Sequence, residues 1–279
     1  MINHLIFEIP ELTATMQRIW SVVDHHLQGV LLSAVLIAVF TSCEVKWPSA
    51  AVGSLRMRLT NISIGLIVAV FALLCTLLLS WVVPLLWREG LIGLLVPSWS
   101  GGGVAGTAIA VVAYGVVWDF FQYWFHRWQH MSASLWPSHR VHHSDESLNT
   151  TSALRRSVLE LILIFVFVLL PTIIVVGVHE VAAPIAFAIF YGWGFFNHAN
   201  IRLSLGVLTP VFSGPQWHRL HHVVNPEYRD RNFAAYFPVL DIMFGTYRAP
   251  SGNNCLMTGV PDADVTAHPF RDCLLPRRR

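Results

Sequence analysis

Five long apolar runs constrain the fold of this chain more than any other feature of its sequence. Each approaches the roughly 20 residues that an α-helix needs to cross a bilayer core about 30 Å thick. The expected spans are residues 28–45, 63–87, 104–125, 158–178 and 181–198. The last two are joined by a short connection and are expected to form a helical hairpin, with a kink at Pro171. The sequence therefore predicts an all-α integral membrane protein with four to five transmembrane helices.

The composition supports this class and excludes others. Hydrophobic residues make up 54% of the 279 residues and charged residues only 12%, against about 25% charged residues in soluble domains, which excludes a soluble globular enzyme. A net charge of +2 lacks the broad basic field that nucleic-acid binding requires, so no nucleic-acid partner is expected. The four cysteines form no CxxC pair, and no redox or disulfide role follows from them.

Basic residues set the expected orientation, because cytoplasmic loops are enriched in Lys and Arg. They gather after the first, third and fifth spans, and only Arg18 and Arg88 fall on the opposite side. Five spans with the N-terminus outside and the C-terminus in the cytosol satisfy this distribution. The expected location is a bacterial inner membrane, or the endoplasmic reticulum if the source is eukaryotic.

The chain is expected to form a single membrane domain whose polar residues gather on one face. Its expected parts are an N-terminal lead-in (1–27), three spans (28–125), a histidine-rich segment (126–157), the helical hairpin (158–198), a histidine-rich cap segment (199–248) and a polar tail (249–279). The tail is rich in proline and polar residues and is expected to be loosely ordered.

The histidines are the strongest functional signal. Of 14 histidines, ten lie between residues 126 and 222, and nine of these, all except His179, form four groups on the expected cytosolic side. The candidate metal ligands are His126, His130, His139, His142, His143, His198, His218, His221 and His222. Spacings of three and four residues place imidazoles on one helix face, where they can chelate a metal. A single HxxxH pair is commonly solvated, but two HxxHH clusters beside it on one membrane face are poorly explained in that way.

The number of imidazoles predicts a dimetal site, because zinc takes four ligands and iron about six. Neutral imidazoles leave the charge of two cations uncompensated, so carboxylates are expected nearby. Asp119 lies two helical turns before His126 within a predicted span, where an acidic residue requires a partner. Glu160 opens the fourth span. Both are candidates for accepting the free N–H of a metal-bound imidazole, as are Asp145 and Glu146, although acidic residues near a membrane face are more often merely solvated.

Ligand type alone does not identify the metal, because imidazole suits iron, zinc, copper and nickel. A zinc peptidase would carry HExxH or its inverted form, and neither occurs. A metal transporter would place ionisable groups in the middle of its spans, and the apolar middles of 63–87, 158–178 and 181–198 carry none. Two irons that activate O2 at the boundary between lipid and cytosol fit best. A zinc-loaded, non-redox metal-binding membrane protein remains the alternative of another class, and zinc is also a possible substitute in purified protein.

Several segments, in order and spacing, resemble the fatty acid hydroxylase and sterol desaturase superfamily of membrane di-iron oxygenases. The resemblance extends over about residues 115–248. It is carried by 119–130 (DFFQYWFHRWQH), 135–144 (LWPSHRVHHS), 149–155, 197–201 (NHANI), 217–222 (WHRLHH), 230–233 (DRNF) and 241–246 (DIMFGT). The family's metal-ligand role falls on the nine histidines named above, with His198 as the ninth.

The resemblance implies a helical membrane stem and a cytosolic helical cap that holds two irons. It also implies O2 as co-substrate and electrons from a separate donor protein, of the cytochrome b5 or ferredoxin type. The expected reaction is hydroxylation of a C–H bond in a lipid, and desaturation at the same site is the alternative. A fatty acyl chain, a sterol-like ring, a carotenoid, a glyceryl ether and an amino-lipid are all compatible substrates.

Two further residue patterns bear on this resemblance. Arg219, Arg229 and Arg231, near the last histidine cluster, offer a docking surface for an acidic electron donor. Where many family members have a histidine before Pro and Glu, this chain has Ser157. Because serine cannot replace an imidazole ligand, this chain is expected to belong to a subgroup that differs there.

Overall fold

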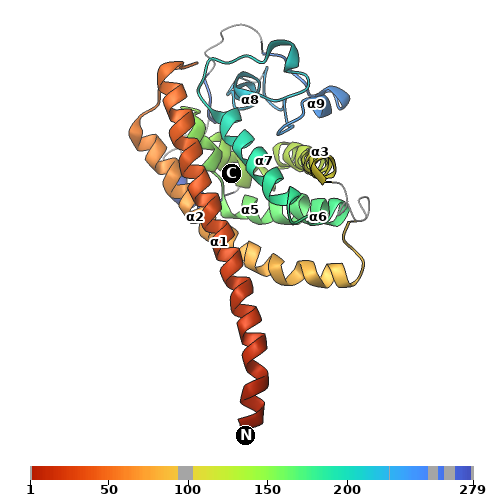
Figure 1. The fold of residues 1–279 in the computed structure, drawn as a ribbon. Coiled ribbons are helices and arrows are strands. Elements are labelled where there is room, and N and C mark those ends of the chain that lie inside the picture. Colours follow the sequence, from red (N-terminus) through yellow and green to blue (C-terminus); the bar gives the residue numbers. More distant parts are fainter. Residues whose placement is uncertain (1, 94–102, 226, 251–256, 261–267, 278–279) are drawn as a thin grey trace.

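A computed structural model shows how these segments are arranged (Figure 1). The structure describes residues 2–93, 103–225, 227–250, 257–260 and 268–277. Within these ranges the regular structure is helical, and β structure is limited to two isolated bridges, Pro48 with Ile201 and Val223 with Thr258. The expectation of an all-α protein is confirmed.

Among the described residues, four helices are long and apolar enough to cross a bilayer. They are Thr13–Lys46, Leu55–Arg88, Gly103–Met131 and Val158–Val176. The fifth expected span corresponds to helix α7 (Ala182–His198), whose 17 residues are at the lower limit of what a bilayer requires. This set of helices fits a multi-pass membrane protein, as the sequence predicts.

The first two helices form a long pair. Helix α1 runs without interruption over Ile2–Lys46, so the described part of the expected lead-in (1–27) and the first span are one helix. Its N-terminal end extends away from the other helices (Figure 1), and contact with α2 is present at Arg18, which lies beside Ser80 and Trp81. Helix α2 (Leu55–Arg88) begins at Ser54, whose hydroxyl accepts the Met57 N–H and thereby caps the helix. The two helices pack against each other.

The remaining long helices form the centre of the stem. Helix α3 (Gly103–Met131) packs against α6 and α7. A side chain at Gly115 of α3 would collide with the ring of Phe190 on α7, so glycine allows the two helices to approach closely. The fourth span consists of α5 (Val158–Ile164), the π-helical segment η2 (Phe165–Leu169) and α6 (Leu170–Val176). Pro171 has no N–H for an α-helical bond, and the wider π turn directly precedes it.

Short elements at the end of the stem opposite the N-terminus form the cap (Figure 1). They are α4 (Trp136–His143), η1 (Thr150–Leu154), η3 (Gly206–Leu208), α8 (Pro215–His221) and α9 (Val239–Met243). Helices α4 and α8 each have proline in the first turn, where its missing N–H costs nothing. These two helices carry most of the histidine clusters.

The described part of the C-terminal tail is packed. Helix α11 (Pro269–Leu274) contacts α2, α4 and α5. Its Cys273 is fully buried in a cluster with Ile64, Val68 and Val158. Residues 269–274 therefore differ from the loosely ordered segment that the composition suggests, because this short helix buries apolar surface. Residues 251–256, 261–267 and 278–279 of the expected tail lie outside the described residues.

Candidate metal centre

All nine histidines singled out in the sequence converge inside the cap, in two groups. The first group contains His126, His130, His139, His143 and His221, and the second contains His142, His198, His218 and His222. Within each group the candidate ligand nitrogens lie within 4.8 Å of one another. All nine side chains are buried or nearly so, although imidazole is a polar group.

Helix geometry distributes the histidines between the two groups. Helix α3 supplies His126 and His130, one turn apart, to the first group. On α4 and α8, adjacent histidines project about 100° apart around the helix axis, so they enter different groups. His142 and His143 separate in this way on α4, and α8 likewise contributes to both groups. Helix α7 ends at His198, which completes the second group.

The Nε2 atoms of neighbouring imidazoles face one another at a uniform spacing. In the first group these distances are 2.9 Å for His126 and His139, 3.1 Å for His139 and His143, and 3.2 Å for His130 and His143. In the second group they are 3.1 Å for His142 and His198, for His198 and His218, and for His218 and His222. Nitrogen ligands that bind one ion at about 2.1 Å and at right angles lie about 3.0 Å apart.

The opposite ring nitrogen, Nδ1, is held by an oxygen atom in six of these imidazoles. The acceptors are Phe233 O for His126, Asp230 Oδ1 for His130, Glu160 Oε1 for His139, Arg155 O for His142, Gly194 O for His198 and Arg231 O for His221. Backbone and carboxylate oxygens accept, so Nδ1 carries the proton and Nε2 directs its lone pair inward. Buried lone pairs that face one another are unfavourable unless a cation lies between them, so this donor set fits two metal ions.

Burial keeps the cap imidazoles neutral at neutral pH. The pKa of His221 is lowered to about 4 by desolvation, which penalises the charged ring. The pKa values of His139, His142, His143, His218 and His222 fall well below the usual histidine value, first through desolvation and then through repulsion from neighbouring rings. Because metals bind the neutral imidazole, these side chains are in the form that coordination requires.

One four-residue loop, 230–233, orients three imidazoles of the first group. Its acceptors are Asp230 Oδ1, 3.1 Å from His130, Arg231 O, 2.8 Å from His221, and Phe233 O, 2.7 Å from His126. The turn requires left-handed backbone at Asp230 and Asn232, with φ of 58° and 60°. Asp and Asn adopt this conformation more readily than other non-glycine residues.

Two buried carboxylates fix the chain that follows this loop. Asp119 accepts the backbone N–H groups of Ala235, Tyr236 and Phe237 at 2.6, 3.0 and 2.6 Å. Asp241 accepts those of Phe233 and Ala234 at 2.7 and 2.9 Å. The structure thus gives Asp119 backbone partners instead of the imidazole partner that the sequence suggests, because the 235–237 segment crosses α3 beside it. Asp119 acts on the first group through this segment.

Glu160 has the contact that the sequence suggests for it. Its Oε1 atom accepts the Nδ1–H of His139 at 2.8 Å, and Arg156 lies 3.5 Å away. Ser157 begins α5: its Oγ accepts the Glu160 N–H at 3.0 Å and donates to Ser138 O at 2.9 Å. The residue that departs from the family pattern is therefore a helix cap that fixes Glu160 and α4 relative to each other.

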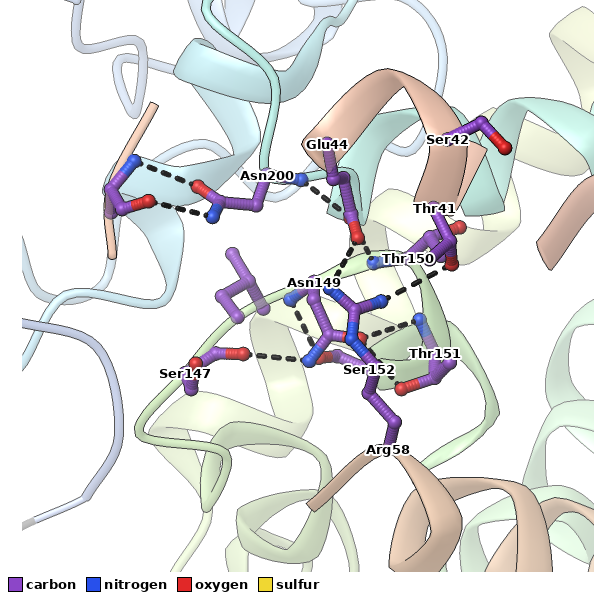
Figure 2. A network of polar contacts seen from close by, with 12 residues as sticks. Thr41, Ser42, Glu44, Arg58, Ser147, Asn149, Thr150, Thr151, Ser152 and Asn200 are labelled. Atoms are coloured by element: carbon purple, nitrogen blue, oxygen red, sulfur yellow. Dashed lines mark hydrogen bonds and ion pairs between the residues drawn. The ribbon is translucent and has the colours of Figure 1, made fainter. Parts of the chain in front are cut away.

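A buried polar network that the sequence interpretation did not identify connects α1 and α2 with η1 and with Asn200 (Figure 2). Glu44 of α1 and Arg58 of α2 form an ion pair at 2.6 Å, and their side chains are 0% and 9% exposed. Glu44 Oε1 also accepts the backbone N–H groups of Thr150 and Asn200, at 2.6 and 2.8 Å. The signal for it was present in the sequence, because Glu44 lies within the first expected span and an acidic residue there requires a partner.

The three arginines expected to dock an electron donor differ in exposure. Arg219 is buried and donates to Leu148 O and Asn200 Oδ1 at 3.0 and 2.9 Å, so it does not belong to a docking surface. It points inward because it lies on the same turn of α8 as two of the buried histidines. Arg229 and Arg231 are exposed.

Comparison with known proteins addresses the same segment. The family model described as fatty acid hydroxylase matches residues 111–246. An alkylglycerol monooxygenase of Danio rerio is 36% identical over 133 residues, which are 48% of this chain and 29% of that protein. A methylsterol monooxygenase of Arabidopsis thaliana is 26% identical over 49% of this chain and 47% of its own length. An ornithine lipid hydroxylase of Rhizobium tropici is 26% identical over 51% of this chain and 43% of its own length.

The family match covers the histidine clusters and the elements that carry them. The chain spans less than a third of the length of the alkylglycerol monooxygenase and less than half of the other two relatives. No solved structure matches the chain significantly. The family match and the relatives confirm the resemblance that the histidine motifs indicate. Residues 111–246, just under half of the chain, therefore resemble a fatty acid hydroxylase domain, in the segment that carries the histidine clusters.

Proposed function

We propose that this protein is a membrane-bound non-haem di-iron oxygenase that hydroxylates a C–H bond of a lipid. In this reaction one atom of O2 enters the C–H bond and the other leaves as water, which consumes two protons and two electrons from an external donor. The observation that carries the proposal is the convergence of nine buried, neutral imidazoles in two groups at the cap end of apolar helices. Iron, when bound, supplies the redox chemistry through which O2 attacks an unactivated C–H bond.

In this proposal the five imidazoles of the first group hold one iron and the four of the second group hold the other. Glu160 supports the first group by keeping His139 in the tautomer that binds a metal, and its negative charge offsets part of the metal charge. Asp119 supports the same group indirectly, through the 235–237 segment.

Aromatic side chains close the first group off from water. Tyr123, Trp217 and Phe233 are at most 1% exposed and pack together beside it. The Phe233 ring lies 5.2 Å from the ring of His130 and 5.5 Å from that of His126. A dry wall of this kind protects a reactive oxidant from side reactions with water.

The names of the relatives suggest the first substrates to test. Alkylglycerol monooxygenases of several animals match this chain at 30% identity or more, whereas the sterol and ornithine lipid enzymes match at 26%. We therefore place a glyceryl ether lipid first, a hydroxylated amino-lipid second and a methylated sterol third. The apolar helices allow each of these lipids to approach from within the bilayer.

The electron donor in this proposal is a separate cytochrome b5-like or ferredoxin-like protein that docks on the exposed basic residues Arg229 and Arg231. The cap and the C-terminus lie in the cytosol and the N-terminus lies outside. A double substitution, Arg229→Glu with Arg231→Glu, should lower donor-dependent turnover while the metal content stays constant, because the Arg231 group that orients His221 is its backbone oxygen. Unchanged turnover would exclude this docking surface.

Two alternatives give different products. A desaturase with the same site would leave a double bond and no new oxygen in the lipid. A zinc-loaded, non-redox protein would leave the lipids of the cell unchanged.

The test is comparative lipidomics under 18O2, in cells that express the wild-type chain or the His142→Ala variant. The expected result is a lipid that carries one 18O atom in wild-type cells and not in variant cells. A new double bond without 18O would favour the desaturase. Identical lipids in both cultures, together with stable zinc and no iron in the purified protein, would favour the zinc-binding alternative.

A further inference from the structure

The two histidine groups are supported by different parts of the chain. In the first group, the oxygen atoms that orient the imidazoles come from the 230–233 loop and from Glu160. The second group instead lies against polar contacts that lead to α1 and α2. Residues 1–88, which contain both of these helices, lie outside the segment matched by the family model.

One route leads from Glu44 to His198. Asn200 follows His198 by two residues, and its N–H donates to Glu44 Oε1 at 2.8 Å. The Asn200 side chain also makes two hydrogen bonds with the backbone of Ala50, at 2.9 and 3.0 Å, and these bonds are drawn in Figure 2. The segment after His198 is therefore attached to the end of α1 and to the loop that follows it.

The same asparagine extends this route to α8. Asn200 Oδ1 accepts a hydrogen bond from Arg219 at 2.9 Å, and Arg219 also donates to Leu148 O at 3.0 Å. Arg219 lies between His218 and His222 on α8. Two more imidazoles of the second group are thus located relative to the α1–α2 loop through a single buried guanidinium.

A second route leads from Asn61 of α2 to His142. The Asn61 side chain is 0% exposed, donates to Asp145 Oδ2 at 2.7 Å and accepts from Arg155 Nη1 at 3.1 Å. Arg155 in turn donates to Val141 O of α4 at 3.1 Å, and its own backbone oxygen accepts the Nδ1–H of His142 at 3.0 Å. All four imidazoles of the second group are therefore linked to α1 or α2 by short series of hydrogen bonds and neighbouring residues.

We infer that Glu44 and Asn61 are positioning residues for the second metal, so that the α1–α2 pair is part of the metal centre as well as part of the membrane stem. This inference rests on the proposed di-iron function. Glu44 acts as the acceptor that fixes the backbone at Thr150 and Asn200. Asn61 holds Asp145 and Arg155 by one hydrogen bond to each. Neither residue touches a metal-facing imidazole directly.

Two double variants separate the acceptor role of Glu44 from its ion pair. Glu44→Gln with Arg58→Met removes the ion pair but keeps an oxygen in place for the two backbone N–H groups. Glu44→Leu with Arg58→Met removes the ion pair and also leaves both N–H groups without an acceptor. The two proteins therefore differ mainly in the contact that the inference depends on.

The measurement is iron per chain after anaerobic loading of the purified full-length protein with Fe2+ and removal of free metal. We expect two irons in the wild type and in Glu44→Gln/Arg58→Met, and one in Glu44→Leu/Arg58→Met. Asn61→Ala, a smaller change, should weaken binding of the second iron at least tenfold and leave the first unchanged. Ser33→Ala is the matched control, because it removes a 2.7 Å contact of α1 with Tyr191 of α7, at a position four helical turns from Lys46, and should keep two irons.

The substitution His218→Ala, added to Glu44→Leu/Arg58→Met, identifies which of the two irons is lost. His218→Ala alone should hold one iron, and adding it to Glu44→Leu/Arg58→Met should cause no further loss, since both changes act on the same group. Two irons in Glu44→Leu/Arg58→Met, or none, would overturn the inference while leaving the di-iron function in place. A wild-type chain that binds fewer than two irons would overturn the proposed function itself and the inference with it.

Discussion

In this cap an oxygen atom that accepts the Nδ1–H of an imidazole fixes the orientation of that ring. In the pair of His139 with Glu160 the acceptor is a buried carboxylate, since Glu160 is 1% exposed. The same tautomer is imposed on His142, His198 and His221 by backbone oxygens, which substitutions do not remove. Asp230 holds His130 in the same way but is exposed, so Glu160 is the buried position at which a mutation can change both orientation and charge.

We expect Glu160→Gln to lower the affinity of the first group for iron about 10- to 100-fold, because the amide oxygen still accepts from His139 but the charge is lost. Isothermal or competitive metal titration measures this change. Glu180→Gln is the control, since Glu180 is an exposed carboxylate between α6 and α7. Equal affinities in Glu160→Gln and the wild type would show that the carboxylate charge has no part in metal binding.

The metal-free protein should lose stability as the pH falls from about 6.5 to about 4. The pKa of His221 is about 4 in the folded chain and about 6.5 in an unfolded chain, so the unfolded state binds more protons in this range and acid favours it. His221 alone contributes roughly 3 kcal/mol to the free energy of unfolding. This contribution is present above about pH 6.5 and is lost as the pH falls to about 4. Thermal unfolding of the metal-free protein at pH 8 and pH 5 measures the loss. A midpoint that does not change with pH would contradict the neutral, buried state of these imidazoles.

At the residue scale the sequence predicted most of the centre. Eight histidines were identified from their spacing, His198 from its position at the same membrane face, and Glu160 from its place at the start of a span. Their division into two groups could not be predicted, because it depends on how α3, α4, α7 and α8 meet in space. Glu44 was missed because its partners, Arg58, Thr150 and Asn200, are far from it in the sequence.

The helices of the stem can be predicted from the length of their apolar runs, whereas the short elements of the cap are held in place by polar contacts. Helix α9 has only five residues, and the irregular chain between α8 and α9 carries the loop that orients three imidazoles. No hydrophobic period exists in so short a segment, which is why its shape could not be read from the sequence. Its backbone is fixed by the carboxylates of Asp119 and Asp241 instead.

Asp119→Ala should therefore destabilise the cap by about 3 kcal/mol, because three buried backbone N–H groups lose their acceptor. Chemical denaturation measures the free energy, and hydrogen exchange should show faster exchange at residues 235–237. Asp24→Ala is the control: Asp24 is exposed on α1 and accepts only from Gln28 among the described residues, so its loss should change stability by less than about 0.5 kcal/mol. Unchanged exchange at 235–237 would contradict the role assigned to Asp119.

At the scale of the whole molecule, the histidine clusters lie in the cap, at the end of the stem opposite the N-terminus (Figure 1). The orientation expected from the charges of the loops assigns the cap to the cytosol and the N-terminus to the outside. This orientation remains a prediction. The distance between the two groups of imidazoles is the least predictable, because it is set by packing across the whole cap.

Thiol labelling tests the orientation in a variant that lacks the native cysteines. A membrane-impermeant reagent should label Glu89→Cys, at the end of α2, in intact cells. It should label Asn225→Cys, in the cap, only after the membrane is permeabilised. Both positions are exposed. The reverse pattern would place the metal centre outside the cell and would require a donor on that side.

Helices α4 and α8 each contribute to both histidine groups, and the last of the nine histidines, His222, is the residue that directly follows α8. During synthesis, the first group is incomplete until His221 has left the ribosome, and the second until His222 has followed it. If the proposed di-iron centre forms, neither ion therefore meets its full set of ligands until α3, α4, α7 and α8 have all been made. Metal uptake would then follow assembly of the cap instead of guiding it.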